Sequence, residues 1–219
     1  MIDFNSTLIS IDKPTDADIS RKAIIANGYS IIDLSASDPI KKKKFEELLG
    51  PIAGKWDLAR PYICKNVDGK YVTTGVSTCG LVARGLWHRM SIDYPALYSN
   101  YVPGSAISGE ISFAKKNKAW QTYVPNSEIK PTPGDYIIIG SGLSTHALTA
   151  LEWADESLIS VDGGQVDNKG LQCIKKRQRK WIIKNNEAYL DDKKVLGWII
   201  FDLLLTRNST VIVPEDWNE

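Results

Sequence analysis

The sequence has few of the residues from which metal sites and disulfide frameworks are built. Among its 219 residues there are three cysteines and two histidines. Cys64, Cys79 and Cys173 form no Cys-x-x-Cys pair, and a small odd number of cysteines in a chain this long does not describe a disulfide scaffold. The same scarcity argues against a structural zinc site. We therefore expect neither a metal nor another cofactor.

Excess charge of one sign and long apolar runs are also absent. Lysine and arginine number 27 against 26 acidic residues, a net charge of +1, so nucleic acid is not an expected partner. The longest charge-free stretches, 94–109 and 136–151, contain glycine and polar residues and predict no membrane span. The N-terminus carries Asp3 and no basic start. This predicts a cytoplasmic protein as synthesised, without a signal peptide, that leaves the cell only by a specialised export route.

Length and pattern favour a single α+β domain over 1–219, with 1–50 as an N-terminal helical extension of a core over 51–219. Start and stop signals and apolar periodicity predict helices at 15–28, 38–50, 78–90 and 110–120. A short apolar segment between the first two predicts a strand at 30–34. After Pro131, β-branched segments between turns predict antiparallel strands at 136–139, 146–153, 158–162, 180–184, 188–190 and 196–205. We expect the helices to pack on one side of a curved sheet.

Cys79 is placed where a cysteine becomes reactive. Ser77 or Thr78 can cap the predicted helix, and either choice puts Cys79 in its first turn. Unpaired backbone N–H groups and the helix dipole favour a thiolate there, and the same N–H groups can stabilise an oxyanion. Gly80 leaves room for a substrate. The alternative is a small buried cysteine that only fills the core.

The general base must be one of two histidines. His88 lies nine residues after Cys79 on the same predicted helix, on the opposite face and about 13 Å further along the axis, so it cannot reach the sulfur. His146 begins an apolar strand after a polar turn. A lone histidine there is often structural, but with a cysteine at a helix start it is the available base.

A third group is expected to orient the imidazole. The strand that begins at His146 leads through a predicted hairpin to 161–165, and antiparallel pairing returns that segment to His146. Asp162 or Gln165 can then accept the ring N–H. An aspartate before Gly163-Gly164 is equally typical of a turn, so the choice between Asp162 and Gln165 stays open.

Several of these residues occur in the order of a known family. Pro61-Tyr62 precedes the run Thr78-Cys79-Gly80-Leu81-Val82, Pro133-Gly134-Asp135 precedes an apolar strand, and His146-Ala147-Leu148 begins the next one. This order resembles the NlpC-like branch of the papain-like cysteine peptidases. The 19-residue spacing from His146 to Gln165 is similar to that of the related CHAP amidases. The resemblance covers about 61–165.

The resemblance implies roles for these residues and a fold. Cys79 would be the nucleophile, His146 the base, and Asp162 or Gln165 the orienting residue. Tyr62 would line the substrate site and help to hold the tetrahedral oxygen. The implied fold is a papain-like (NlpC-type) core with N-terminal helices packed on a small, antiparallel, barrel-like sheet. Thr78 and Gly80 stand where the family has aspartate and serine, and we expect both of them, like Tyr62, to face and bind the substrate.

The expected function is hydrolysis of amide bonds by a cysteine peptidase or amidase. The resemblance implies peptidoglycan stem peptides or other cell-wall fragments as substrate. One alternative is acyl transfer, as in transglutaminases, with the same Cys–His pair, and another is a non-catalytic binding module on this fold. The sequence identifies no cognate inhibitor or secretion partner.

A basic run lies outside these motifs. It comprises Lys175, Lys176, Arg177, Arg179 and Lys180. Such a run is typical of an exposed strand edge protected by charge. The alternative is a docking patch for an acidic substrate.

Overall fold

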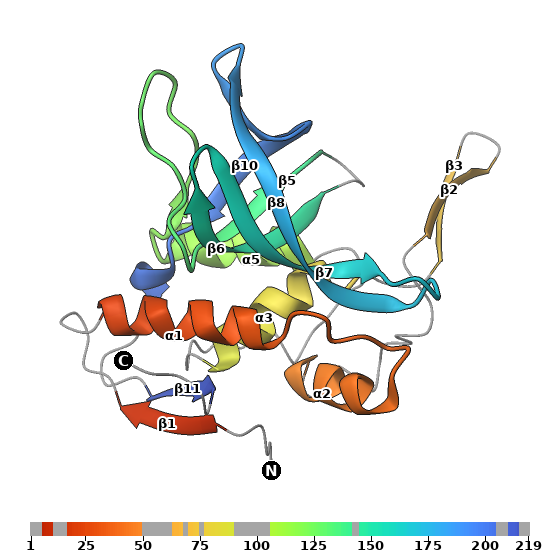
Figure 1. Ribbon diagram of the computed structural model, residues 1–219. Coiled ribbons are helices and arrows are strands. Elements are labelled where there is room, and N and C mark those ends of the chain that lie inside the picture. The colour runs from red at the N-terminus through yellow and green to blue at the C-terminus, as the bar shows by residue number, and fades with distance from the viewer. Residues whose placement is uncertain are drawn as a thin grey trace.

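A layer of helices lies below a closed antiparallel β-barrel in the computed structural model (Figure 1). The residues that the structure describes are 6–10, 17–49, 63–67, 70–74, 77–89, 106–141, 145–204 and 210–214. This is the mixed α+β fold expected from the sequence. Tyr62 lies outside the described residues.

Four α-helices are present in these described ranges, and each corresponds to a predicted one. They are α1 (Ala17–Ser30), α2 (Pro39–Leu49), α3 (Cys79–Arg89) and α5 (Ala106–Lys116). Asp38 caps α2, since its Oδ1 accepts the backbone N–H groups of Ile40 and Lys41 at 2.9 Å. The last helix starts four residues earlier than its predicted start at 110.

Six strands form the barrel, and it closes where the last two of them pair with each other. The strands are β5 (Tyr136–Ile139), β6 (His146–Ala154), β7 (Ser157–Val166), β8 (Gln172–Lys184), β9 (Glu187–Leu190) and β10 (Lys193–Ile199). The short β4 (Trp120–Gln121) pairs with the end of β10. The remaining strands form two separate pairs, β1 (Ser6–Ser10) with β11 (Thr210–Pro214) and β2 (Ile63–Val67) with β3 (Lys70–Thr74).

One predicted strand was wrong, and another was predicted too long. The segment 30–34 is a turn followed by a single bridge from Ser35 to Cys173, because α1 continues to Ser30 and Asp33 has a left-handed φ of 66°. The segment 196–205 is a strand only to Ile199. After that the backbone N–H of Phe201 donates to Asp135 at 3.0 Å, and a 3-10 helix, η3 (Phe201–Leu204), begins.

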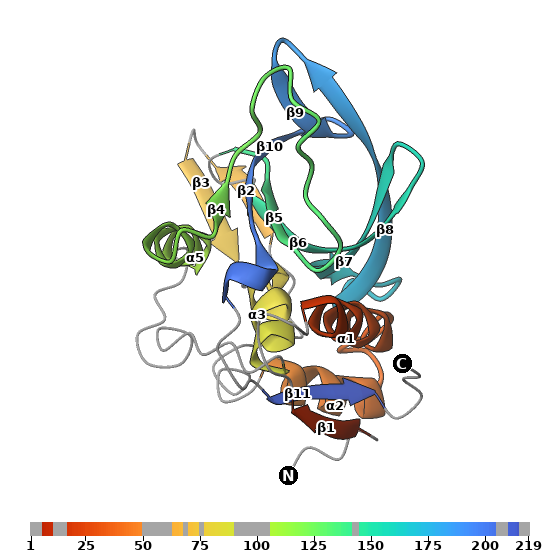
Figure 2. The same cartoon turned by 90° about the vertical axis from the view of Figure 1, so that its left-hand side faces the viewer.

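The barrel strands separate two hydrophobic cores. Tyr136 and Ile138 pack into the core shared with the helices, whereas Ile137 and Ile139 fill the barrel with Trp181. This alternation follows from the two-residue repeat of a strand. In Figure 2 the barrel is seen end-on, with α1 and α3 beneath it. The strand that carries His146 is therefore held by packing on both faces.

Asp135, from the Pro133-Gly134-Asp135 motif, joins the barrel to the helices. Its buried carboxylate accepts hydrogen bonds from Phe201 N–H and from the backbone and hydroxyl of Thr132, and it pairs with Arg21 of α1 at 3.2 Å. Burial raises the pKa of Asp135, and Arg21 opposes that rise. The motif thus supports the start of β5 and lies outside the site described below.

The glycine at position 85 lets α3 approach α2 closely. A Cβ built on Gly85 would lie 2.5 Å from the backbone oxygen of Leu48, which cannot move out of the way without shifting α2. At the end of α3, the buried Arg89 donates to Asn27 of α1 at 2.8 Å. The helix that carries Cys79 is therefore fixed against both neighbouring helices.

We predict that Gly85→Ala lowers the free energy of unfolding by about 1–3 kcal/mol, because the added methyl group overpacks the contact with α2. Urea unfolding of the whole chain measures this change. The control is Lys43→Ala on the exposed side of α2, which should stay within about 0.5 kcal/mol of the parent. Equal stability of the two variants would contradict this packing.

Candidate active site

Cys79 is the first residue of α3, and its environment is set by the two residues before it. The backbone oxygen of Thr78 accepts the N–H of Val82 at 3.0 Å, so Thr78 is the residue that caps the helix. The hydroxyl of Ser77 accepts the N–H of Cys79 at 3.3 Å. Cys79 is 7% exposed, and the helix start presents it to the barrel strands.

Thr78 and Gly164 attach β7 to the start of α3. The hydroxyl of Thr78 accepts the backbone N–H of Gly164 at 2.8 Å, and Thr78 itself is fully buried. Gly164 has a φ of +66°, and a Cβ there would collide with Ser77 and lie 3.4 Å from the Cβ of Cys79. The side chain of Thr78 is thus occupied in holding the strand, which corrects the expectation that it faces substrate.

His146 stands between Cys79 and Asp162. It begins β6, and its side chain is 21% exposed. Its Nε2 lies 2.7 Å from Oδ2 of Asp162, so Nδ1 is the ring nitrogen left to interact with the thiol of Cys79, and that interaction helps to raise the pKa of His146. The backbone of Ala147 also helps to lower the pKa of that thiol. The structure therefore brings together Cys79, His146 and one of the two candidate orienting residues.

Gln165 is not the residue that contacts His146. Its side-chain amide donates to the backbone oxygen of Gly163 at 3.4 Å, and its backbone pairs with Cys173 on β8. The register of β7 shifts between Asp162 and Gln165. Such a bulge re-aims the side chains that follow it, and only Asp162 is directed to the imidazole.

Arg179 on β8 holds the other side of Asp162. Its Nη2 donates to Oδ2 of Asp162 at 2.6 Å and its Nη1 to Oδ1 at 3.2 Å. Ser160 also donates to Oδ1 at 2.6 Å. The side chain of Arg179 is 12% exposed, unlike the exposed Arg177 in the same basic run. Sequence reasoning missed Arg179 because the run gives no sign of which cation turns inward.

The charges of this group favour a thiolate and an imidazolium. Burial alone would raise the pKa of Cys79, but its hydrogen bond to His146 and the charge of His146 lower it below the ordinary value. Burial opposes protonation of His146, yet its bonds to Asp162 and Cys79 raise its pKa to about 9. Despite burial, His146 and Arg179 lower the pKa of Asp162. At neutral pH this geometry supports an ion pair between Cys79 and His146.

A buried group of three side chains lies behind Gly80. Glu110 of α5 accepts hydrogen bonds from Arg84 and from the hydroxyl of Tyr136. A Cβ on Gly80 would lie 3.3 Å from both Glu110 and Tyr136. The space beside Gly80 is therefore filled by these side chains, which corrects the expectation that it admits substrate. Trp87 packs edge-on against Tyr136, with ring centres 5.2 Å apart.

Within the described ranges, no three His, Cys, Asp or Glu side chains are grouped to hold a metal ion. No helix among these residues is long and apolar enough to cross a membrane. Comparison with models of known protein families gives no match, and comparison with curated proteins gives none either. The functional argument therefore depends on the geometry of Cys79, His146 and Asp162.

We predict that Cys79 reacts with iodoacetamide at a rate that levels off below pH 8.5, because a thiolate paired with imidazolium forms at lower pH than an ordinary thiol. In His146→Ala the pH midpoint of this reaction should rise. The hydrogen bond and the charge of His146, which both lower the pKa of Cys79, are then lost. Mass spectrometry of the peptide that carries Cys79 measures the rate. Cys173 is the internal control, because burial raises its pKa. A midpoint for Cys79 at or above that of Cys173 would refute the ion pair.

We also predict that Arg179→Gln destabilises the fold by about 3–5 kcal/mol at pH 7, because it leaves the buried charge of Asp162 without its guanidinium partner. Chemical unfolding measures the loss. Arg177→Gln is the matched control on the same strand and should change stability by less than about 0.5 kcal/mol. Similar losses in the two variants would show that the pairing of Arg179 with Asp162 contributes little.

Proposed function

We propose that this protein is a cysteine amidase or peptidase built on a papain-like core. One observation carries the proposal: His146 interacts on one side with the thiol of Cys79, whose pKa it lowers, and lies on the other side 2.7 Å from the buried carboxylate of Asp162. A nucleophile, a base and a group that orients the base are the parts that covalent amide hydrolysis requires.

The reaction follows from the protonation states of this pair. The Cys79 thiolate attacks the carbonyl carbon of an amide, and a tetrahedral oxyanion forms. His146, as imidazolium, gives its proton to the nitrogen of the leaving amine, and the carbon–nitrogen bond breaks to leave a thioester. Neutral His146 then takes a proton from water, which attacks the thioester. The carboxylic acid leaves, and Cys79 returns to its thiolate beside imidazolium.

Asp162 acts through His146. Its carboxylate accepts the N–H of Nε2 and so keeps Nδ1 directed at the sulfur and at the leaving group. Because Arg179 and Ser160 hold both carboxylate oxygens, Asp162 is fixed before substrate arrives. Such preorganisation lowers the cost of reaching the transition state.

The resemblance of the motifs to NlpC-like peptidases makes peptidoglycan stem peptides the proposed substrate, and a cell-wall fragment the proposed partner. Acyl transfer to an amine uses the same thioester and is separated from hydrolysis by its product. A non-catalytic binding module would form no thioester.

We predict that purified muropeptides are cleaved at an amide bond by the wild type and that Cys79→Ala lowers the rate at least 1,000-fold, because the covalent route is lost. Mass spectrometry of the products measures this change. Cys173→Ala should retain the wild-type rate. Equal cleavage by wild type and Cys79→Ala would refute the assignment.

The same reactions with added hydroxylamine identify the intermediate. A thioester yields a hydroxamate, whereas a protein that only binds muropeptides yields none. A conjugate formed with an added peptide amine in place of the free acid would assign acyl transfer to the Cys79 site.

A further inference from the structure

The side chain of Ser77 lies beside Cys79 and has no role in the mechanism proposed for Cys79 and His146. Its hydroxyl oxygen accepts the backbone N–H of Cys79 at 3.3 Å, so the side chain is directed along the first turn of α3. Ser77 is partly exposed, whereas Thr78 and Cys79 after it are buried. Ser77 therefore lies between the buried start of the helix and the surface.

The strand β7 confines the hydroxyl of Ser77 to this place. A Cβ built on Gly164 would collide with the hydroxyl oxygen of Ser77, and it would lie 3.1 Å from the backbone nitrogen and 3.4 Å from the Cβ of Cys79. These atoms therefore share the space in which residue 164 would have a side chain. Because Gly164 also donates its N–H to Thr78, the strand and the helix start hold the hydroxyl close to Cys79.

The hydroxyl of Ser77 still has its hydrogen to donate. A serine hydroxyl carries one donor hydrogen and accepts at its oxygen, and here the oxygen is used by the N–H of Cys79. The sulfur of the same cysteine is an acceptor, and a hydrogen bond to an anion such as a thiolate is about twice as strong as one between neutral groups. Against the effect of burial, Ser77 acts together with His146 to lower the pKa of Cys79.

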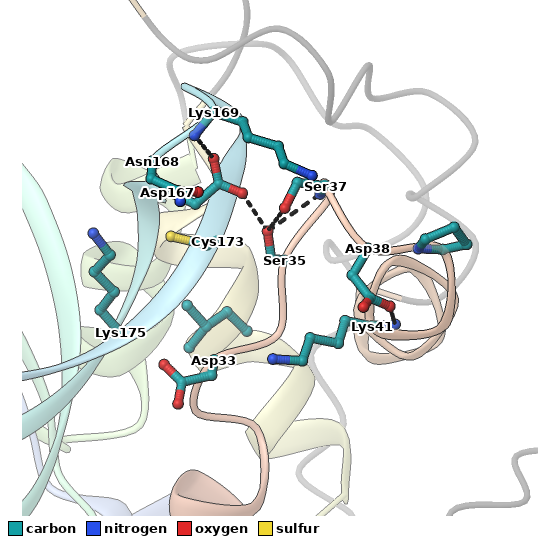
Figure 3. A pocket seen from close by; sticks show the side chains of 12 residues that line it. Asp33, Ser35, Ser37, Asp38, Lys41, Asp167, Asn168, Lys169, Cys173 and Lys175 are labelled. Carbon is teal, nitrogen blue, oxygen red and sulfur yellow. Dashed lines mark hydrogen bonds between the residues drawn. The ribbon is translucent and has the colours of Figure 1, made fainter.

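The same arrangement occurs elsewhere in the molecule, with a carboxylate in place of the thiolate. Ser35, in the turn that follows α1, accepts the backbone N–H of Ser37, two residues on, at 3.2 Å. Its hydroxyl donates to the carboxylate of Asp167 at 2.6 Å (Figure 3). This bond is the largest of the effects that hold the pKa of Asp167 below its ordinary value. A serine in this kind of turn thus stabilises an anion beside it.

Two other side chains act on Cys79 from the barrel strands. His146 on β6 interacts with it and has a raised pKa, so it supplies a positive charge. Tyr136 on β5 stays neutral, because burial and Glu110 raise its pKa well above the ordinary value. Glu110 is itself paired with Arg84. Ser77 carries no charge, so a change in the titration of Cys79 on removal of its hydroxyl would report a lost hydrogen bond.

We propose that Ser77 is a further catalytic residue, whose hydroxyl donates a hydrogen bond to the Cys79 thiolate while its oxygen accepts the N–H of the same residue. Ser77 keeps its proton throughout. Its effect is to keep the thiolate present at lower pH, and the hydrogen bond weakens as the negative charge leaves the sulfur during attack on the carbonyl carbon. The effect on hydrolysis rests on the proposed function, whereas the hydrogen bond to the thiolate does not.

The first experiment follows the alkylation of Cys79 by iodoacetamide across pH, in the full chain. Ser77→Ala should raise the pH midpoint by about one unit, because the thiolate loses a hydrogen bond to a charged group. The rate at high pH should stay at or above that of the wild type, since a thiolate of higher pKa is the stronger nucleophile. Ser77→Gly also lacks the hydroxyl and should show the same rise. Ser77→Thr keeps a hydroxyl and should keep the wild-type midpoint.

Ser35→Ala is the matched control for these variants. It removes a serine from the same kind of turn, beside Asp167, and should leave the midpoint of Cys79 unchanged. An unchanged midpoint in Ser77→Ala overturns the proposal, even where urea unfolding shows that the variant has lost stability, because Ser77 is then only a structural residue. A rise that Ser77→Thr shares overturns it too, since the hydroxyl is then not the cause.

The second experiment measures kcat/KM for the hydrolysis of muropeptides across pH. Ser77→Ala should move the acidic limb of this profile to higher pH by the same shift as the alkylation midpoint, and its rate should converge with that of the wild type above both midpoints. A loss of equal size at every pH overturns the proposed role. If the wild type hydrolyses nothing, the proposed function fails, and the alkylation midpoints then decide whether Ser77 stabilises the thiolate.

Discussion

The buried carboxylate of Asp162 is the group on which the rest of the site depends. Its side chain is fully buried, so its charge has to be balanced by partners. Arg179 balances it from β8, and His146 faces it from β6. Because β7 lies between these two strands, the barrel sets the distances within the group. The imidazole can then support a thiolate at Cys79 only if α3 is held against the same strands.

Contacts between uncharged groups hold α3 against these strands. Gly164 admits the start of α3 because a side chain there would collide with Ser77, and Thr78 ties the strand to the helix. Gly85 permits close contact with α2. The site is therefore assembled from segments far apart in the chain, each positioned by local packing. Cys79 begins α3 and His146 begins β6, so the two side chains meet where a helix and a strand start.

Much of this site could be predicted because its signals are local. Ser77-Thr78 before an apolar helix indicates where Cys79 lies, and the apolar segment that begins at His146 indicates the strand that presents this histidine. The choice between Asp162 and Gln165 needed the register of β7, which a bulge alters. Arg179, Glu110 and Arg84 could not be identified because their roles depend on tertiary burial. For the same reason the space at Gly80 was misjudged, since α5 and β5 fill it.

We expect Asp162 to keep His146 charged beside Cys79, and the protonation of His146 tests this expectation most directly. Nuclear magnetic resonance of imidazole-labelled histidine across pH gives the pH at which His146 is half protonated, in the wild type and in Asp162→Asn. We expect a pH midpoint near 9 for His146 in the wild type and a clearly lower one in the variant, because the carboxylate charge that favours imidazolium is gone. A wild-type midpoint near the ordinary value of about 6.5, unchanged by Asp162→Asn, would contradict it.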